Sequence, residues 1–363
     1  MKNLGFLLAP ALTLLLGLCW ALSQLAGWPA ITAPVLALAT LYLLLPLADA
    51  IIGDDHRPYR EHPQSARWLN ALPPAMLAFQ TAHVGIFLWL ALDSDPAVAG
   101  LLMLAAGIIS SVSAINSAHE LVHRPQRWKR VVGGLLLCTT AYPGFKIEHV
   151  RGHHRWVATP HDASSAPKGM SLYRFLPRAL LGNTVNAWRL AEASARSRNG
   201  KTSSRLARFI ANEAVRWWCL TGLIAVALAL SLGWLALALW LGHSLVAILT
   251  LETINYVEHY GLRRQRLANG QYEAVRPQHS WNCSNRLSNW MLLGLQRHSD
   301  HHAHAGRAFP ELRHQANAPQ LPAGYAAMML LALVPPLWFR IMHSRLPEDP
   351  DSGRAAEGSL AHD

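Results

Sequence analysis

The stretch 97–123, AVAGLLMLAAGIISSVSAINSAHELVH, decides the fold of this chain. It begins with the uncharged run Ala97–Ala118, which as a helix is long enough to cross the roughly 30 Å of hydrocarbon in a bilayer. The run leads directly into HELVH, in which His119 and His123 stand four residues apart. Residues at this spacing lie on one face of a helix. The stretch therefore predicts a membrane-spanning helix whose end presents two imidazoles.

Five further apolar runs of similar length occur in the chain. Hydrophobic residues make up 52% of the 363 residues, and they are gathered in blocks rather than spread as a soluble core would need. About 20 residues cross a membrane as a helix. The first run is too long for a signal peptide and leads into a second one. We therefore predict an all-α integral membrane protein with six transmembrane helices, at residues 4–26, 30–52, 74–92, 97–118, 215–232 and 234–254.

Basic residues divide the connections between these spans into two kinds. The links at residues 27–29 and 93–96, and the link between the last two spans, contain no Lys or Arg, whereas the long loops are rich in both. Loops rich in Lys and Arg stay in the cytoplasm. Both termini and every histidine motif are therefore predicted on the cytoplasmic side of a bacterial-type inner (plasma) membrane. Loops lying against anionic membrane lipid explain the net charge of +11, and no motif points to nucleic acid.

The chain shows no internal repeat, so we predict a single membrane-embedded domain over residues 1–346. The tail 347–363, rich in Asp, Glu, Gly, Ser and Ala, is predicted to be disordered. Two weaker apolar stretches, Val131–Phe145 and Ala323–Met342, are predicted to be interfacial or re-entrant. None of the four cysteines forms a C-x-x-C pair, so the sequence carries no iron–sulfur module.

Three later motifs repeat the close spacing of histidines: EHVRGHH at 148–154, NYVEHYG at 255–261 and LQRHSDHH at 295–302. In an α-helix His149 and His153 would share a face, with His154 turned away by about 100°. Imidazole suits iron, zinc, copper and nickel, and nine imidazoles are too many for one four-coordinate ion. The spacing therefore predicts two metal ions held close together, by His119, His123, His149, His153, His154, His259, His298, His301 and His302.

Four acidic residues stand within or beside these motifs: Glu120, Glu148, Glu258 and Asp300. An all-nitrogen ligand set leaves few carboxylates on the metal. We therefore expect the four to accept hydrogen bonds from the ligating imidazoles and to fix their orientation.

The first motif also matches the HExxH pattern of zinc proteases, in which two histidines bind zinc and the glutamate is the general base. That interpretation accounts for His119 and His123 and leaves seven histidines without a role. An intramembrane zinc protease therefore stays open as an alternative from another class of enzyme.

The four motifs resemble those of the membrane-bound alkane 1-monooxygenase (alkane hydroxylase) family, within the histidine-box fatty acid desaturase/hydroxylase superfamily. The similarity covers residues 46–312 and the NYxEHYG motif separates this family from ordinary fatty-acyl desaturases. The chain departs from the family at His161, where an acidic residue is expected, and at the additional His304. Flanking letters are similar as well, at Gly53-Asp54-Asp55, Ala158-Thr159-Pro160, Asn255-Tyr256 and Leu295-Gln296-Arg297.

The resemblance implies that the nine histidines are catalytic and ligate two iron ions (Fe²⁺/Fe³⁺). It implies a monooxygenase that uses O₂ to hydroxylate an unactivated, terminal C–H bond of an alkane or alkyl chain. Electrons would come from rubredoxin and rubredoxin reductase as separate chains. The hydrophobic substrate is expected to enter from the bilayer between the second, third, fourth and sixth spans. A fatty-acyl desaturase or hydroxylase on the same scaffold stays open as an alternative.

Overall fold

The computed structural model describes residues 3–59, 63–199 and 204–347. Within these ranges the secondary structure is helical, and extended segments meet only in isolated bridges. The prediction of an all-α membrane protein is therefore confirmed. The predicted disordered tail falls, apart from Pro347, outside the described residues.

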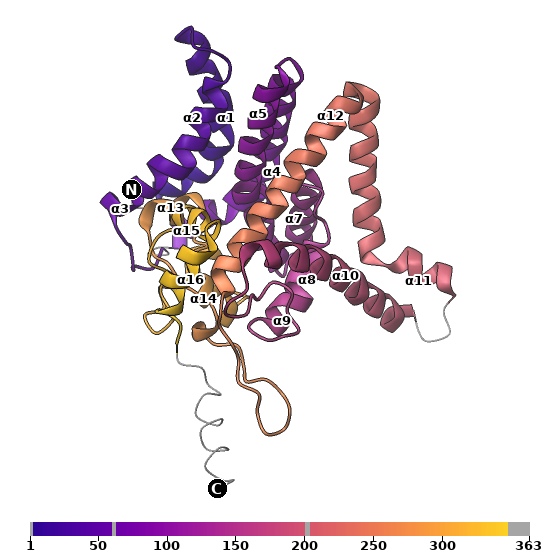
Figure 1. Ribbon diagram of the computed structural model, residues 1–363. Helices are drawn as coiled ribbons and strands as arrows, with labels where there is room; N and C mark the ends of the chain where they lie inside the picture. The colour runs from indigo at the N-terminus through magenta and orange to yellow at the C-terminus, as the bar shows by residue number, and fades with distance from the viewer. Residues whose placement is uncertain (1–2, 60–62, 200–203, 348–363) are drawn as a thin grey trace.

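Long apolar helices make up one half of the molecule (Figure 1). Because the solvent around a membrane span is lipid, many of their leucines, such as Leu25 and Leu230, are exposed rather than packed. In the described part of the chain, the helices that are long and apolar enough to span a bilayer cover Leu4–Leu25, Thr32–Ile52, Arg67–Leu92, Pro96–Val122 and Glu213–His259.

The last of these, α12 (Glu213–His259), covers both the fifth and the sixth predicted span. Its backbone leaves the helical region at Gly233, where φ is 87° and ψ is 173°. Glycine adopts this positive φ without steric cost. Figure 1 shows the result, two arms of α12 that meet in a sharp bend. The bend lies at the single residue that the sequence analysis left between two spans; the count of six spans remains a prediction.

The remaining long helices are assembled from shorter segments. The third apolar helix belongs to α4, which starts at Pro63 and so begins earlier than the predicted residue 74. The fourth contains a π-helical turn, η3, and then continues into the segment that carries His119. The segments are η1 (Leu4–Leu7), α1 (Leu8–Leu25), α2 (Thr32–Ala39), η2 (Thr40–Leu44), α3 (Leu45–Ile52), α4 (Pro63–Leu92), α5 (Pro96–Ser110), η3 (Ser111–Ile115) and α6 (Asn116–Val122).

Shorter helices gather at one end of the apolar bundle (Figure 1). The weak apolar stretch after residue 322 forms two helices broken before Pro335, and they pack against the end of α12 through Tyr256, Tyr260 and Trp338. The helices of this end are α7 (Arg127–Thr139), α8 (Phe145–Glu148), η4 (His149–His153), α9 (His154–Trp156), α10 (Leu172–Asn199), α11 (Arg205–Ala211), η5 (Pro277–His279), α13 (Arg286–Met291), α14 (His298–Ala303), η6 (Phe309–Glu311), α15 (Tyr325–Ala332) and α16 (Pro335–His343).

Two neighbouring helices of the bundle, α5 and α12, position the first and third histidine motifs. Helices α5 and α12 pack along each other, sharing a core that includes Leu102, Ala106 and Trp240. Since α5 continues through η3 into α6, the ends of α6 and α12 reach the same end of the bundle. The short helices η4, α9 and α14 then bring their own histidines to this point.

Candidate metal centre

The nine predicted histidines lie together in two groups at the end of the bundle. Within each group the ring nitrogens that could bind a metal lie within 4.8 Å of one another. Helices α6, α9, η4 and α14 supply the five-histidine group: His119, His123, His149, His154 and His301. Helices η4, α12 and α14 supply the four-histidine group: His153, His259, His298 and His302.

The second histidine motif is divided between the two groups. The rings of His149 and His153 stack with their centroids 5.3 Å apart, as a common face implies, but residues His149–His153 form a π-helical turn. Hydrogen bonds from i to i+5 replace the usual i to i+4 pattern in such a turn. His149 therefore aligns with His154, and their Nε2 atoms lie 3.0 Å apart. His153 turns toward the other group, with its ring centroid 4.8 Å from that of His259.

The last motif is also divided, here by ordinary helical geometry. His298 and His302 are four residues apart on α14 and both face the four-histidine group. His301, between them, belongs to the five-histidine group, with its Nε2 3.1 Å from Nε2 of His154. Segments η4–α9 and α14 thus each supply ligands to both groups and hold the two together.

Several buried imidazole nitrogens have no protein partner. Among the described residues, Nε2 of His119, His123, His153 and His302 is buried without a hydrogen bond. Leaving a buried polar atom unpaired costs about 1–3 kcal/mol. Two nitrogens bound at right angles to one ion, at about 2.1 Å each, lie about 3 Å apart. The Nε2 atoms of His259 and His298 have this separation, 3.1 Å. Unpaired atoms and spacing both fit a metal ion in each group.

The protonation states of most of these imidazoles also suit a metal. Burial, and repulsion from neighbouring imidazoles, lower the pKa of His154, His301 and His302 well below the usual range. A low pKa keeps an imidazole neutral at pH 7, which is the form that binds a metal.

His153 is an exception because a buried carboxylate faces it. Burial alone would lower the pKa of His153, but attraction to Asp162 outweighs it and raises the pKa to about 9. The Nδ1–H of His153 donates to Oδ2 of Asp162 over 2.9 Å. Asp162 is held in turn by the hydroxyl of Ser165 at 2.6 Å and the backbone N–H of Ser164 at 3.1 Å. This chain of contacts aims Nε2 of His153 into its group.

Sequence reasoning missed Asp162. It expected an acidic residue at position 161, and the acid stands one position later. His161 instead lies against the rings of Trp156 and Tyr272. Asp162 could have been identified from its position in the loop that follows the second motif, because this loop is short enough to bring it back to His153, nine residues earlier.

Glu258 is the predicted acidic residue that reaches an imidazole ligand. Its Oε2 lies 3.1 Å from Nε2 of His298, on the ring nitrogen that faces His259. The carboxylate therefore lies beside the metal-binding atoms rather than behind the imidazole. Its Oε1 accepts a hydrogen bond of 2.7 Å from the hydroxyl of Tyr325. No motif marks Tyr325, and the sequence analysis gave its segment no role in the site.

The structure gives Glu120 other partners than the predicted imidazoles. Its Oε1 lies 3.4 Å from Nε of Arg124 and accepts the backbone N–H of Phe309 at 3.3 Å. Glu120 therefore ties α6 to the segment after α14.

Asp300 has a similar bracing role. Oδ1 of Asp300 accepts from the side chains of Arg307 and Gln315, both at 2.7 Å, and Oδ2 accepts from the backbone of Arg313. The additional histidine of the sequence, His304, lies 3.2 Å from the same carboxylate. Glu148 packs on Gly152 inside the π-helical segment, where an added Cβ would come within 2.5 Å of its Oε1.

A narrow apolar cavity of about 40 Å³ has Tyr325 in its wall, and Tyr325 contacts Glu258 beside His298. Its walls come from α1, the η2–α3 segment, the α5–η3 segment, α12, α13 and α15. Leu12, Tyr42, Ile108 and Ile254 line it, and so does Tyr325, whose hydroxyl contacts Glu258. The second, fourth and sixth predicted spans contribute to its wall, together with α1 and α15, and the substrate path itself stays a prediction.

The fold and the two groups define a membrane enzyme with two histidine groups that could hold metal ions. The family model described as fatty acid desaturase matches residues 95–332, which hold all four motifs. Alkane 1-monooxygenase 2 of Pseudomonas aeruginosa is 42% identical over 86% of this chain and 84% of its own length. Alkane 1-monooxygenase 1 of that organism is 39% identical over 90% and 86%. Alkane 1-monooxygenase 2 of Alcanivorax borkumensis is 47% identical over 67% and 63%.

The chain belongs to the alkane 1-monooxygenase family, within the fatty acid desaturase family of membrane proteins. The resemblance drawn from its motifs is therefore confirmed, and the chain is an oxidoreductase. The zinc-protease alternative finds no support, because the HELVH histidines share their group with three others.

Proposed function

We propose that this chain hydroxylates an unactivated, terminal C–H bond of an alkane or alkyl chain, using O₂ and two iron ions. The observation that carries the proposal is the pair of histidine groups beside an apolar cavity, linked to it through Tyr325 and Glu258. Family membership supports it, since the relatives are named alkane 1-monooxygenases.

One iron ion would be held by each histidine group. Bound iron would supply the redox chemistry for activating O₂, which amino-acid side chains lack. The protein's part is to keep most of the imidazoles neutral, and to orient them and shield them from bulk water. All nine are held at one end of the bundle, and the carboxylate of Asp162 sets the ring orientation of His153.

The cavity supports a substrate that is an apolar chain. Leucine, isoleucine and methionine side chains line most of it, and such walls bind an alkyl chain without directional contacts. Tyr325 is the polar group where the cavity approaches Glu258. A substrate end at Tyr325 would lie next to the four-histidine group.

Iron content and product analysis test the proposal. Purified protein reconstituted in lipid, with rubredoxin, rubredoxin reductase and O₂, should convert octane to 1-octanol and contain two irons per chain. Palmitoyl lipid and p-xylene supplied in the same assay test the related substrates. Turnover of the fatty-acyl chain alone would favour the desaturase or hydroxylase alternative. The match of the fatty acid desaturase model at residues 95–332 is compatible with that alternative. Zinc in place of iron would contradict the proposal.

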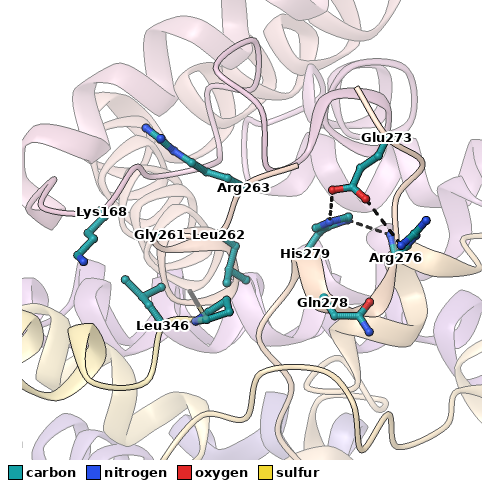
Figure 2. Close-up of a pocket in the computed structure, with 10 residues that line it drawn as sticks. Lys168, Gly261, Leu262, Arg263, Glu273, Arg276, Gln278, His279 and Leu346 are labelled. Atoms are coloured by element: carbon teal, nitrogen blue, oxygen red, sulfur yellow. Dashed lines mark hydrogen bonds and ion pairs between the residues drawn. The ribbon is translucent and has the colours of Figure 1, made fainter. Parts of the chain in front are cut away.

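We propose that the separate electron donor, rubredoxin with its reductase, docks on a basic pocket beside the four-histidine group. The pocket, of about 440 Å³, is lined by Lys168, Arg263 and Arg276 (Figure 2). Glu273 is its acidic member, and it pairs with His279 at 3.3 Å and with Arg276 at 3.8 Å.

The position of this pocket suits electron transfer. Gly261 on its wall follows the ligand His259 by two residues. Excess positive charge would steer a carrier with an acidic surface to this point.

Charge reversal tests the docking proposal. Lys168→Glu combined with Arg263→Glu should raise the KM for rubredoxin at low salt and leave turnover with a small chemical reductant unchanged. Arg205→Glu combined with Arg208→Glu, on the distant helix α11, is the matched control. Equal KM values in wild type and the pocket variant would refute this docking site.

We further propose that both termini and the histidine groups face the cytoplasm of a bacterial-type inner membrane, as the distribution of Lys and Arg indicates. Cysteine labelling tests this orientation in a Cys219→Ser background, because Cys219 is the exposed native thiol among the four cysteines. A membrane-impermeant reagent should label Ser94→Cys in intact cells and Ser197→Cys only after the membrane is opened. Labelling of Ser197→Cys in intact cells would invert the topology and separate the site from its cytoplasmic reductant.

A further inference from the structure

A second basic cavity lies beside the segment that carries His149, His153 and His154, with Val150 and Arg151 in its wall. It has a volume of about 640 Å³ and is bounded by α7, the η4 segment, the end of α10 and the start of α12. One acidic residue, Glu213, lines it together with six basic residues: Arg127, Arg130, Lys146, Arg151, Arg198 and Arg216.

The positive charge in this cavity is not balanced by the protein. Glu213 is shared by two cations, since it pairs with Lys146 and with Arg151, the latter at 2.8 Å. Arg130 is bonded to the backbone carbonyl of Arg124 at 2.9 Å, which leaves its charge uncompensated. Arg127 and Arg216 are exposed and make no hydrogen bond or ion pair with the described residues.

The cavity lies at the level of lipid headgroups. Arg216 is followed directly by Trp217 and Trp218 and then by the apolar first arm of α12. Tryptophan next to a basic residue at the end of a span is typical of the membrane–water interface. Apart from Glu213, the non-basic part of the lining is apolar and includes Val131, Trp217 and Leu220. Trp218 and Val131 are exposed, as expected for surfaces in contact with acyl chains.

We propose that this cavity binds the phosphate headgroup of one anionic phospholipid, such as phosphatidylglycerol, with the acyl chains lying along Val131 and Leu220. Arginine guanidinium groups match phosphate oxygens with paired hydrogen bonds. Basic pockets between membrane helices on the cytoplasmic side are recognised sites for anionic lipids. A free phosphate ion would satisfy the same charges, but it would leave the apolar half of the lining exposed.

The bound lipid would brace the segment that carries three of the metal-binding histidines. Val150 and Arg151 line the cavity, whereas His149, His153 and His154 of the same turns belong to the metal groups. Lys146, one turn earlier, lies over the ring of Trp217 at 5.2 Å and so joins this segment to α12. An anion bridging Arg151 and Arg216 would tighten the same connection.

Lipid binding to the purified full chain tests the proposal. Native mass spectrometry of the wild type should show one phosphatidylglycerol bound in preference to phosphatidylcholine. Arg127→Gln combined with Arg216→Gln should weaken that binding by roughly 10- to 30-fold, because each removes one basic residue near the headgroup. These two side chains are exposed and make no hydrogen bond or ion pair with the part of the chain that the structure describes, so the variant should keep the wild-type circular dichroism spectrum. Phosphatidylglycerol should also raise the Tm of the wild type more than that of the variant.

Matched controls separate this site from general attraction to anionic membranes. Arg205→Gln combined with Arg208→Gln removes the same charge from α11 and should bind the lipid as the wild type does. Equal affinity of the wild type for both lipids, equal binding by the cavity variant, or an equal loss in the α11 variant would overturn the proposal. Displacement of the lipid by millimolar inorganic phosphate would also overturn it, in favour of a free-phosphate site.

Discussion

The five-histidine and four-histidine groups use the same ligand type in different surroundings. In the five-histidine group the rings lie against one another and against Phe145, which stacks on His149 with centroids 4.6 Å apart. In the four-histidine group, carboxylates reach two rings, Asp162 on His153 and Glu258 on His298. Asp162 accepts from the outer N–H of its ring, a contact that fixes the orientation of a ligating imidazole and raises its basicity, whereas Glu258 lies on the nitrogen that faces the group. The four-histidine group is thus the one with carboxylates, and it is linked to the apolar cavity through Tyr325.

Removing one ligand from each group should give the largest effects. His301→Ala and His153→Ala should each lower bound iron and abolish hydroxylation, because imidazole is the only ligand type that the groups supply in number. Metal analysis of the purified variants beside product assays gives both readouts. Full activity with normal iron in either variant would show that its group is not a metal site.

Asp162→Asn should produce the next largest effect and confine it to the four-histidine group. The variant keeps the size of the side chain and removes the charge that faces Nδ1 of His153. Loss of such a partner costs about 10- to 100-fold in metal affinity or activity. Competition with a chelator measures the affinity of the weaker-binding iron. Unchanged affinity would mean that the ring of His153 is oriented by its packing alone.

Tyr325→Phe should have a smaller effect, on turnover more than on iron content. It removes the donor to Oε1 of Glu258 and leaves the aromatic ring in the cavity wall. A lost hydrogen bond costs about 0.5–1.5 kcal/mol, or roughly 2- to 12-fold if all of it falls on turnover. Tyr256→Phe is the matched control, because that hydroxyl bonds to the backbone of Met170, away from the histidines. Equal losses in both variants would argue against a special role for Tyr325.

Glu120→Gln should affect the metal groups least, despite its position between two ligands. Its carboxylate contacts Arg124 and the backbone of Phe309 rather than an imidazole. We expect a lower Tm, corresponding to about 1–3 kcal/mol, with normal iron content. Arg124 retains backbone acceptors at Gly306 and Arg307, which should limit the loss. Loss of iron without a change in Tm would restore the role that the sequence first suggested.

Much of the architecture was predictable because its signals are local. Length and hydropathy mark the apolar helices, and glycine at position 233 marks the bend that separates two arms of α12. The histidines of the site could be chosen from their spacing, since the four motifs supply all nine members of the two groups. The lining of the apolar cavity was not predictable in this way, because Leu12 and Tyr325 come from segments that carry no motif.

The sequence by itself determined the membrane-helix content of this protein and the identity of its imidazole-rich motifs, because hydrophobic length and residue spacing act within one segment. The tertiary structure alone decided how the imidazoles are divided. The π-helical turn sends His153 to one group and His149 and His154 to the other, and that turn depends on backbone hydrogen bonds that spacing does not specify. It also decided that Asp162 and Glu258, rather than Glu120 or Asp300, contact the ligating rings. Such contacts arise between segments that meet only when the helices pack.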